Sequence, residues 1–303
     1  MMFFTDWEGP WILTDFAYEL CMAVFNNDRF FRNLSEYDDY LAYELKKPEY
    51  EAGYTVKLIV PFLAAAGIKN DFVRMLAEKS ARFVPRAKEA MELIKKKHTP
   101  VVISTSYSIY LETTAALLGL KNYLHGSKID FDEINLENTL NLLEKIDEIA
   151  SLRNQELYEK LNELFSIPEM AKILKKLHTI GAAEKAKILE DYCNRFNIDF
   201  PVAIGDSISD YKMFEMAKKL GGVAIAFNGN EYAIKNADIA IISENALIEA
   251  IVIEKLLENK NLDALKDLRS RELYFVEDCD LSEIIEKSKR MRVKLRGVAG
   301  ELG

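Results

Sequence analysis

The sequence predicts an α/β protein with a parallel β-sheet covered by helices. Short apolar runs, rich in β-branched or aromatic residues and ending in small or polar residues, recur along the chain, which favours buried strands. Helical patterns lie between these runs, and strand–helix alternation is typical of parallel sheets. The expected strands are residues 3–5, 101–104, 202–205, 223–227 and 239–242.

The helical segments between these strands are of unequal length. Residues 15–83 are helical in pattern and rich in aromatic residues, and they are too long for a simple crossover. We interpret them as an inserted helical cap, in which the aromatic residues form a core. Residues 132–177 form a second helical insertion, with apolar residues at helical spacing over 138–149 and 155–165.

The remaining residues divide into a core and a C-terminal extension. The core is expected to comprise residues 1–14, 84–131 and 178–250, and the extension residues 251–303. We expect helices over 246–257 and 281–290 and a strand over 273–276.

Composition limits the classes of function. The 303 residues are 49% hydrophobic and 29% charged, with a net charge of −9, so nucleic acid is not an expected partner. A small phosphorylated ligand needs only a local positive site and a divalent metal ion. Three scattered cysteines, no signal peptide and no apolar run long enough to span a membrane predict a cytoplasmic protein without a transmembrane segment.

Two acidic residues follow the first expected strand. Asp6 and Glu8 lie two residues apart, and alternate residues of a strand point the same way. At the carboxyl end of a parallel strand both carboxylates can reach one crevice, where a hard divalent cation would offset their repulsion. Solvated turn acids are the alternative interpretation.

Hydroxyl groups follow the second expected strand. Ser104 and Thr105 lie where we expect this strand to end and a helix to begin. The free N–H groups of a helix start favour an anion, and a hydroxyl adds a donor. Helix N-capping by Ser or Thr is the alternative.

A lysine lies early in the helix that precedes the third expected strand. Lys185 opposes the helix dipole at this position, and reaching a phosphate would account for it. A surface lysine is the alternative, and Lys187 is the competing candidate.

The third strand ends in the strongest signal. Asp206 follows the buried run 202–205, and Asp210 comes four residues later. If Ser207 begins a helical turn, both carboxylates lie on one side of it, as metal ligands would. The alternative is an N-capping Asp206 with a solvated Asp210.

These four segments, in this order, resemble motifs I to IV of the haloacid dehalogenase-like (HAD) superfamily. The stretches KILEDYCNRFNIDFPVAIGDSISDYKMFEMA and AFNGNEYAIKNADIAI look most like its phosphoserine-phosphatase-like subgroup. The resemblance implies a Rossmann-like HAD core with a cap inserted after motif I. From DWEGPWILTD to RGVAGELG the chain also resembles a little-characterised archaeal HAD group, some members of which are labelled subunit R of an energy-converting hydrogenase.

By this resemblance, the protein would be a Mg²⁺-dependent phosphatase that acts on a small phosphorylated metabolite. Asp6 would be the nucleophile and Glu8 the general acid/base, and Ser104, Thr105 and Lys185 would bind the phosphoryl group. Mg²⁺ would be held by Asp6, Glu8 through its main-chain carbonyl, Asp206 and Asp210.

Two features favour an alternative. Glu8 stands where the family usually has a second Asp, and its extra methylene moves the carboxyl group. A basic tail, KRMRVKLR over 289–296, is either a solvated helix end or a surface for a partner. The alternative is a weakly catalytic or non-catalytic HAD-fold regulatory or assembly protein, in a complex with another protein or as a homo-oligomer.

Overall fold

A seven-stranded sheet with helices on both faces forms one lobe of the protein. The computed structural model describes residues 1–48, 50–134, 141–268 and 271–301. The strand order is β3-β2-β1-β4-β5-β6-β7, and all neighbours are parallel except β6 and β7. The strands are β1 Met2–Thr5, β2 Thr99–Tyr107, β3 Leu124–Ser127, β4 Val202–Gly205, β5 Val223–Phe227, β6 Ile239–Ile241 and β7 Leu273–Phe275.

Alternation along the strands separates two hydrophobic cores, one on each face of the sheet. Phe3 of β1 belongs to one core and Phe4 to the other, because successive side chains of a strand point to opposite faces. One face packs against α6, α7 and α14, with α5 packed on α7, and the other face packs against α11, α12, α13 and α15. These helices are α5 Asn70–Ser80, α6 Ala87–Lys95, α7 Ser108–Leu117, α11 Ala182–Phe196, α12 Tyr211–Lys219, α13 Glu231–Asn236, α14 Leu247–Asn259 and α15 Leu281–Arg296.

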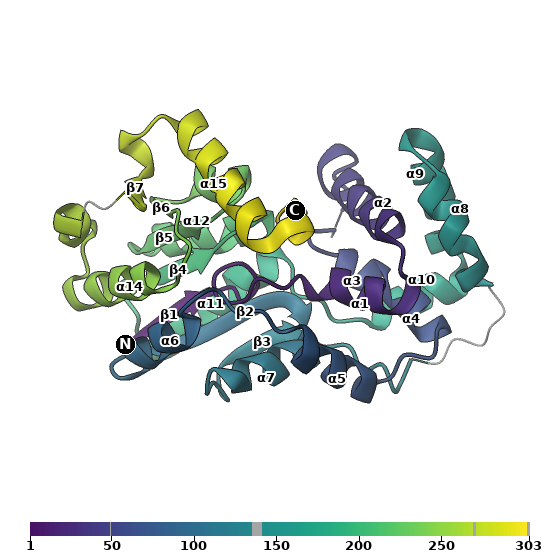
Figure 1. Ribbon diagram of the computed structural model, residues 1–303, viewed down its shortest axis with the longest axis horizontal. Coiled ribbons are helices and arrows are strands. Elements are labelled where there is room, and N and C mark those ends of the chain that lie inside the picture. The colour runs from purple at the N-terminus through teal and green to yellow at the C-terminus, as the bar shows by residue number, and fades with distance from the viewer. Residues whose placement is uncertain (49, 135–140, 269–270, 302–303) are drawn as a thin grey trace.

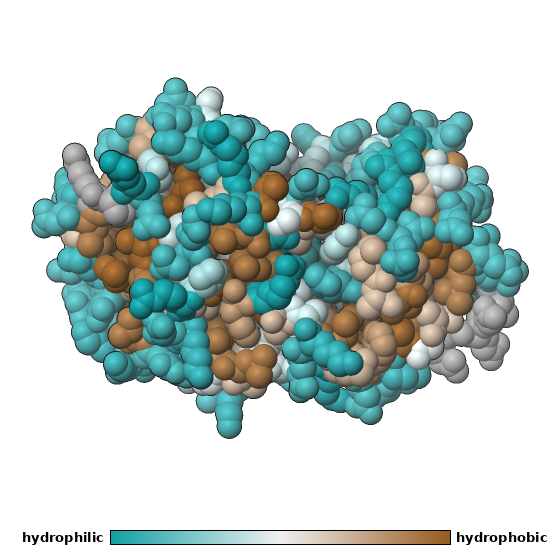
Figure 2. All heavy atoms as spheres, in the orientation of Figure 1, coloured by the Kyte–Doolittle hydropathy of each residue, from teal (hydrophilic) through white to brown (hydrophobic). Residues whose placement is uncertain are grey.

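Helices from both insertions form the second lobe, and the C-terminus lies between the two lobes (Figure 1). Figure 2 shows the same face as spheres, with the outline of the molecule narrowing between the lobes. Buried aromatic residues such as Phe30 and Tyr37 hold this lobe together, and its core continues into that of one sheet face. The helices are α1 Phe16–Phe25, α2 Asp28–Asp39, α3 Thr55–Leu58, α4 Val60–Ala65, α8 Lys145–Ser151, α9 Asn154–Ser166 and α10 Pro168–Lys176.

The α/β fold is confirmed, and all five expected strands are present, together with the strand expected near 273–276. Two details differ. The strand β3, Leu124–Ser127, was not predicted, because its sequence LHGS is short and has no apolar run. The helix expected over 138–149 begins at Lys145, after a 3₁₀ turn at Leu142–Glu144, and residues 138–140 lie outside the described part of the chain.

The other expected helices match α9, α14 and α15, although α15 extends to Arg296. Within the described ranges, no helix is long and apolar enough to cross a membrane.

Glu249 in α14 is completely buried, and neither carboxyl oxygen has a hydrogen-bond partner among the described residues. Burial raises the pKa of Glu249 well above its usual value, because no nearby charge stabilises the ionised form. The folded state therefore keeps a proton on Glu249 at pH values where the unfolded chain has released it. Because of this difference, the free energy of unfolding falls as pH rises above about 4.3, the ordinary pKa of a glutamate.

We expect Glu249→Met to stabilise the protein. The replacement keeps the side-chain length and removes an unpaired buried polar group, which corresponds to about 1–3 kcal/mol in the free energy of unfolding. The gain should be larger at pH 8 than at pH 4.5, as measured by urea unfolding at both values. Glu254→Met in the same helix is the control, because Glu254 is partly exposed and pairs with Lys97. Equal effects of the two substitutions at pH 8 would contradict this explanation.

Candidate active site

A small cavity lies where the carboxyl ends of β1 and β4 face the cap. Its volume is about 120 Å³. The floor carries the charged residues Asp6, Glu8, Asp15, Asp206, Arg292 and Arg296. The cap wall is formed by Phe31, Ser35, Asp38, Asp39, Thr55 and Val56. The carboxyl edge of a parallel sheet is where ligands of open α/β folds bind.

The ammonium group of Lys185 bridges the two acidic motifs. Its Nζ donates to Asp6 Oδ2 and to Asp210 Oδ1, both at 2.7 Å, and to Ser209 Oγ at 3.2 Å. Burial alone would lower the pKa of Lys185, but the carboxylates of Asp210 and Asp6 more than offset this and raise it. Lys185 is therefore a fully buried, charged lysine and not a surface residue, whereas Lys187 is exposed.

Asp210 also accepts hydrogen bonds from the backbone of its own loop. Its Oδ2 accepts from the N–H groups of Asp206 and Ser207, both at 3.0 Å, and so forms a capping box with Ser207. This box begins the 3₁₀ turn Ile208–Asp210 directly after β4. Gly205 leaves room for the carboxylate, since a Cβ atom there would lie 2.2 Å from Asp210 Cγ.

Three carboxylates converge around Lys185. Oxygen atoms of Asp6, Asp206 and Asp210 all lie within 4.8 Å of one another, and all three residues are buried. Burial and the charges of Asp210 and Asp206 raise the pKa of Asp6 to about 7, although Lys185 offsets part of the effect. Three neighbouring carboxylates repel one another, and a bound cation would offset this repulsion.

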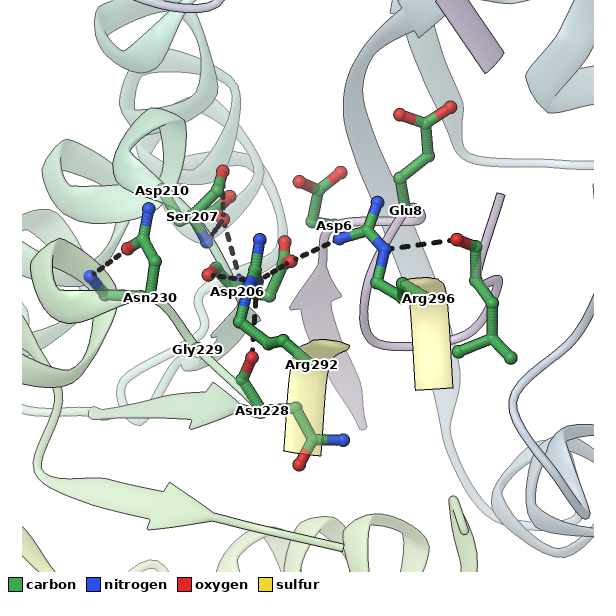
Figure 3. A network of polar contacts seen from close by, with 12 residues as sticks. Asp6, Glu8, Asp206, Ser207, Asp210, Asn228, Gly229, Asn230, Arg292 and Arg296 are labelled. Atoms are coloured by element: carbon green, nitrogen blue, oxygen red, sulfur yellow. Dashed lines mark hydrogen bonds and ion pairs between the residues drawn. The ribbon is translucent and has the colours of Figure 1, made fainter. Parts of the chain in front are cut away.

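Two arginines of the C-terminal helix α15 already engage one of these carboxylates (Figure 3). Nη1 of Arg292 lies 2.5 Å from Asp206 Oδ2, and Nη1 of Arg296 lies 2.9 Å from the same oxygen. Arg292 also donates to the main-chain carbonyls of Asp206 and Asn228. Both arginines are buried, at 3% and 8% exposure.

The side chain of Glu8 extends away from the carboxylates of Asp6 and Asp206 (Figure 3). Its Oε1 accepts from the N–H of Phe16, the first residue of α1, at 3.1 Å. Burial and the neighbouring Asp15 raise the pKa of Glu8 to about 8, so the side chain tends to hold a proton near neutral pH. Asp15 caps α1 through Tyr18 and lines the same cavity.

The prediction that the second strand ends at Ser104 and a helix then begins is wrong. Strand β2 continues to Tyr107, with a register shift against β3 between Ile103 and Tyr107, and α7 begins at Ser108. A polar strand segment at a sheet irregularity has the same composition as a helix start, which explains the error. Ser104 is buried and accepts from the N–H of Ser106, whereas Thr105 lines the cavity.

The interpretation of residues 289–296 as a solvated end or partner surface is wrong for two of the basic side chains. The buried residues of α15 are Ile284, Ser288, Arg292 and Arg296. This spacing of four places them on one face of a helix. The spacing is visible in the sequence and could have distinguished Arg292 and Arg296 from their exposed neighbours.

Known proteins resemble this chain in both sequence and structure. A family model described as haloacid dehalogenase-like hydrolase matches residues 78–252, which include Lys185, Asp206 and Asp210. The chain belongs to this family of HAD hydrolases. A search of the curated proteins found no match.

Solved structures share the HAD fold. A gene product from Archaeoglobus fulgidus is 60% identical, with a TM-score of 0.97 over 100% of this chain and 98% of that one. A substrate-bound phosphoserine phosphatase is 14% identical, with a TM-score of 0.54 over 85% of this chain and 96% of that one. A HAD family hydrolase from Salmonella enterica serovar Typhi is 16% identical, with a TM-score of 0.51 over 76% and 62%.

Removal of the bridging ammonium should destabilise this HAD protein. We expect Lys185→Met to lower the free energy of unfolding by about 3 kcal/mol, because the buried carboxylates of Asp6 and Asp210 lose their shared cation. Urea unfolding at pH 7.5 in EDTA measures the change. The control is Lys187→Met, which removes the same charge from an exposed position of the same helix. A Lys185→Met protein as stable as the control would show that the ion pairs add no net stability.

Proposed function

We propose that this protein is a Mg²⁺-dependent phosphatase that hydrolyses a small phosphorylated metabolite through an aspartyl-phosphate on Asp6. One observation carries the proposal. Asp6 follows β1 at the floor of the cavity, 2.7 Å from the ammonium of Lys185 and within 4.8 Å of carboxylate oxygens of Asp206 and Asp210. This combines a carboxylate nucleophile, a cation for phosphoryl oxygens and the oxygen ligands of a hard metal ion.

The charges of the site fit a divalent cation. Four carboxylates (Asp6, Asp15, Asp206 and Asp210) lie near three cationic side chains (Lys185, Arg292 and Arg296), a formal excess of one negative charge, to which Glu8 adds another when it ionises. We infer that Asp6, Asp206 and the main-chain carbonyl of Glu8 hold Mg²⁺. Asp210 orients them, since both of its oxygens already accept hydrogen bonds. When bound, Mg²⁺ neutralises charge on the phosphoryl oxygens.

The remaining steps fall to side chains of the cavity. Asp6 attacks phosphorus, the ester P–O bond breaks, and the leaving oxygen takes a proton from Glu8. Glu8 then removes a proton from the water that hydrolyses the aspartyl-phosphate. Its raised pKa suits the acid role. Lys185 and Thr105 bind phosphoryl oxygens, in preference to the buried Ser104.

The cap wall indicates the kind of leaving group. Its polar lining consists of the hydroxyls of Ser35 and Thr55 and the carboxylates of Asp38 and Asp39, and no lysine or arginine lines this wall within the described ranges. A second phosphate or a carboxylate would meet negative charge there. A leaving group with hydroxyl or amine donors fits better, and the small cavity favours a small metabolite.

The test is phosphate release from a panel of small phosphomonoesters. We expect release that depends on Mg²⁺, stops with EDTA and falls by at least about 10³-fold in Asp6→Asn, because the nucleophile is lost. Phosphorylated polyols and amino alcohols should exceed phosphorylated carboxylic acids. Asp71→Asn, an exposed carboxylate in α5, is the control. Equal release by wild type and Asp6→Asn would disprove the mechanism.

Glu8 is tested separately with p-nitrophenyl phosphate. Its leaving group needs little protonation, so Glu8→Gln should still form the aspartyl-phosphate. Hydrolysis of that intermediate should slow by about 10²–10⁴-fold. The expected result is a rapid burst of one nitrophenolate per protein followed by slow turnover. Steady-state turnover equal to wild type would exclude Glu8 as the acid/base.

The arginine pair on Asp206 favours a second candidate, a HAD-fold regulatory protein with little turnover. Such a protein would keep the charged cluster for structure or binding, as the label of subunit R in the similar archaeal group would allow. Absence of phosphate release from the whole panel, in both wild type and Glu8→Asp, would support this candidate.

A further inference from the structure

We propose that Arg292 and Arg296 set the divalent-cation affinity of the site, by competing with the metal ion for the charge of Asp206. The proposal rests on the metal site of the proposed function, but it concerns residues of the C-terminal extension that none of the four motifs includes. Its basis is the position of two guanidinium groups on the same carboxylate oxygen, Asp206 Oδ2.

The first argument is electrostatic. Two guanidinium nitrogens lie within 3 Å of Asp206 Oδ2, so a dication bound to Asp206 would share this carboxylate with two positive charges. Both arginines are buried, so water screens the repulsion poorly. Both arginines pair with the same carboxylate, Asp206, so the metal ion and the arginines depend on the same negative charge.

The second argument concerns how α15 is attached. Its buried face contacts the loops that form the site: Ser288 donates to the carbonyl of Gly229, Arg292 to those of Asp206 and Asn228, and Arg296 to that of Leu13. Arg292 is therefore held in place by several oxygens and does not simply swing into solvent. Cation binding at Asp206 is expected to weaken the attachment of α15 to these loops.

A third observation links α15 to the cap. Beyond the helix, Glu301 pairs with Arg32 of α2 at 3.3 Å, and the C-terminus lies between the lobes. The segment that competes for Asp206 therefore also joins the core to the cap. The coupling between two sites is the same in both directions. If metal binding weakens the attachment of α15, then a mutation that weakens this attachment should raise the affinity for the metal ion.

The experiment measures Mn²⁺ affinity directly, by electron paramagnetic resonance of free Mn²⁺, in the full-length protein without substrate. We expect Arg296→Gln and Arg292→Gln to bind Mn²⁺ roughly ten-fold more tightly than wild type. Lys294→Gln is the matched control, because it removes the same charge from the same helix at an exposed position that pairs with Glu244. In an Asp206→Asn background, Arg296→Gln should have no such effect.

Circular dichroism and thermal unfolding establish that each variant is folded. Arg296→Gln is the variant on which the result depends if Arg292→Gln, which loses more contacts, does not fold. Hydrogen exchange provides a second readout: saturating Mg²⁺ should accelerate exchange of the α15 amides in wild type.

Affinity that is unchanged or weaker in Arg296→Gln would overturn the proposal. If phosphate release nonetheless requires Mg²⁺, the proposed function stands without it. Tighter Mn²⁺ binding by the arginine variants without turnover on any phosphomonoester would support the proposal and count against the phosphatase. Failure of every variant to bind Mn²⁺ would overturn both the competition and the metal site.

Discussion

A buried network of opposite charges connects the elements that meet at the carboxyl edge of the sheet. Lys185 of α11 joins Asp6, which follows β1, to Asp210, which follows β4. Each of these groups would be unstable alone in the interior, because transfer of an unpaired charge out of water is costly. The network therefore requires all of its members at once, and it fixes how α11, β1 and β4 come together.

The same requirement explains the C-terminal extension. Lys185 compensates Asp6 and Asp210, whereas Asp206 pairs with the two arginines of α15. The extension thus supplies the positive charges that compensate the buried Asp206 of the core. It also packs on one face of the sheet through Ile284. The cap is tied to the same region by Glu8, which accepts a hydrogen bond from the first residue of α1.

Function and stability conflict in such a site. A carboxylate that must bind a metal ion or attack phosphorus is useful only if its partners can be exchanged, and the partners that stabilise the folded chain compete with that use. Asp6, held by Lys185 and the N–H of Trp7, and Asp206, held by two arginines, both show this competition. In the proposed metal site, the carboxylates favour a cation, and the arginines compete with it for Asp206.

The sequence by itself determined most of the sheet and which carboxylates lie at its carboxyl edge. Strand–helix alternation predicted five strands, and polar residues at the ends of β1 and β4 indicated that Asp6, Asp206 and Asp210 meet, because carboxyl ends of parallel strands share one edge. Lys185 was found because a lysine is unfavourable early in a helix. Only the tertiary structure showed that Arg292 and Arg296 reach Asp206, since no local rule connects residues 86 and 90 positions apart in the chain. It also placed Thr105, and not Ser104, at the cavity, because the irregularity in β2 depends on pairing with β3.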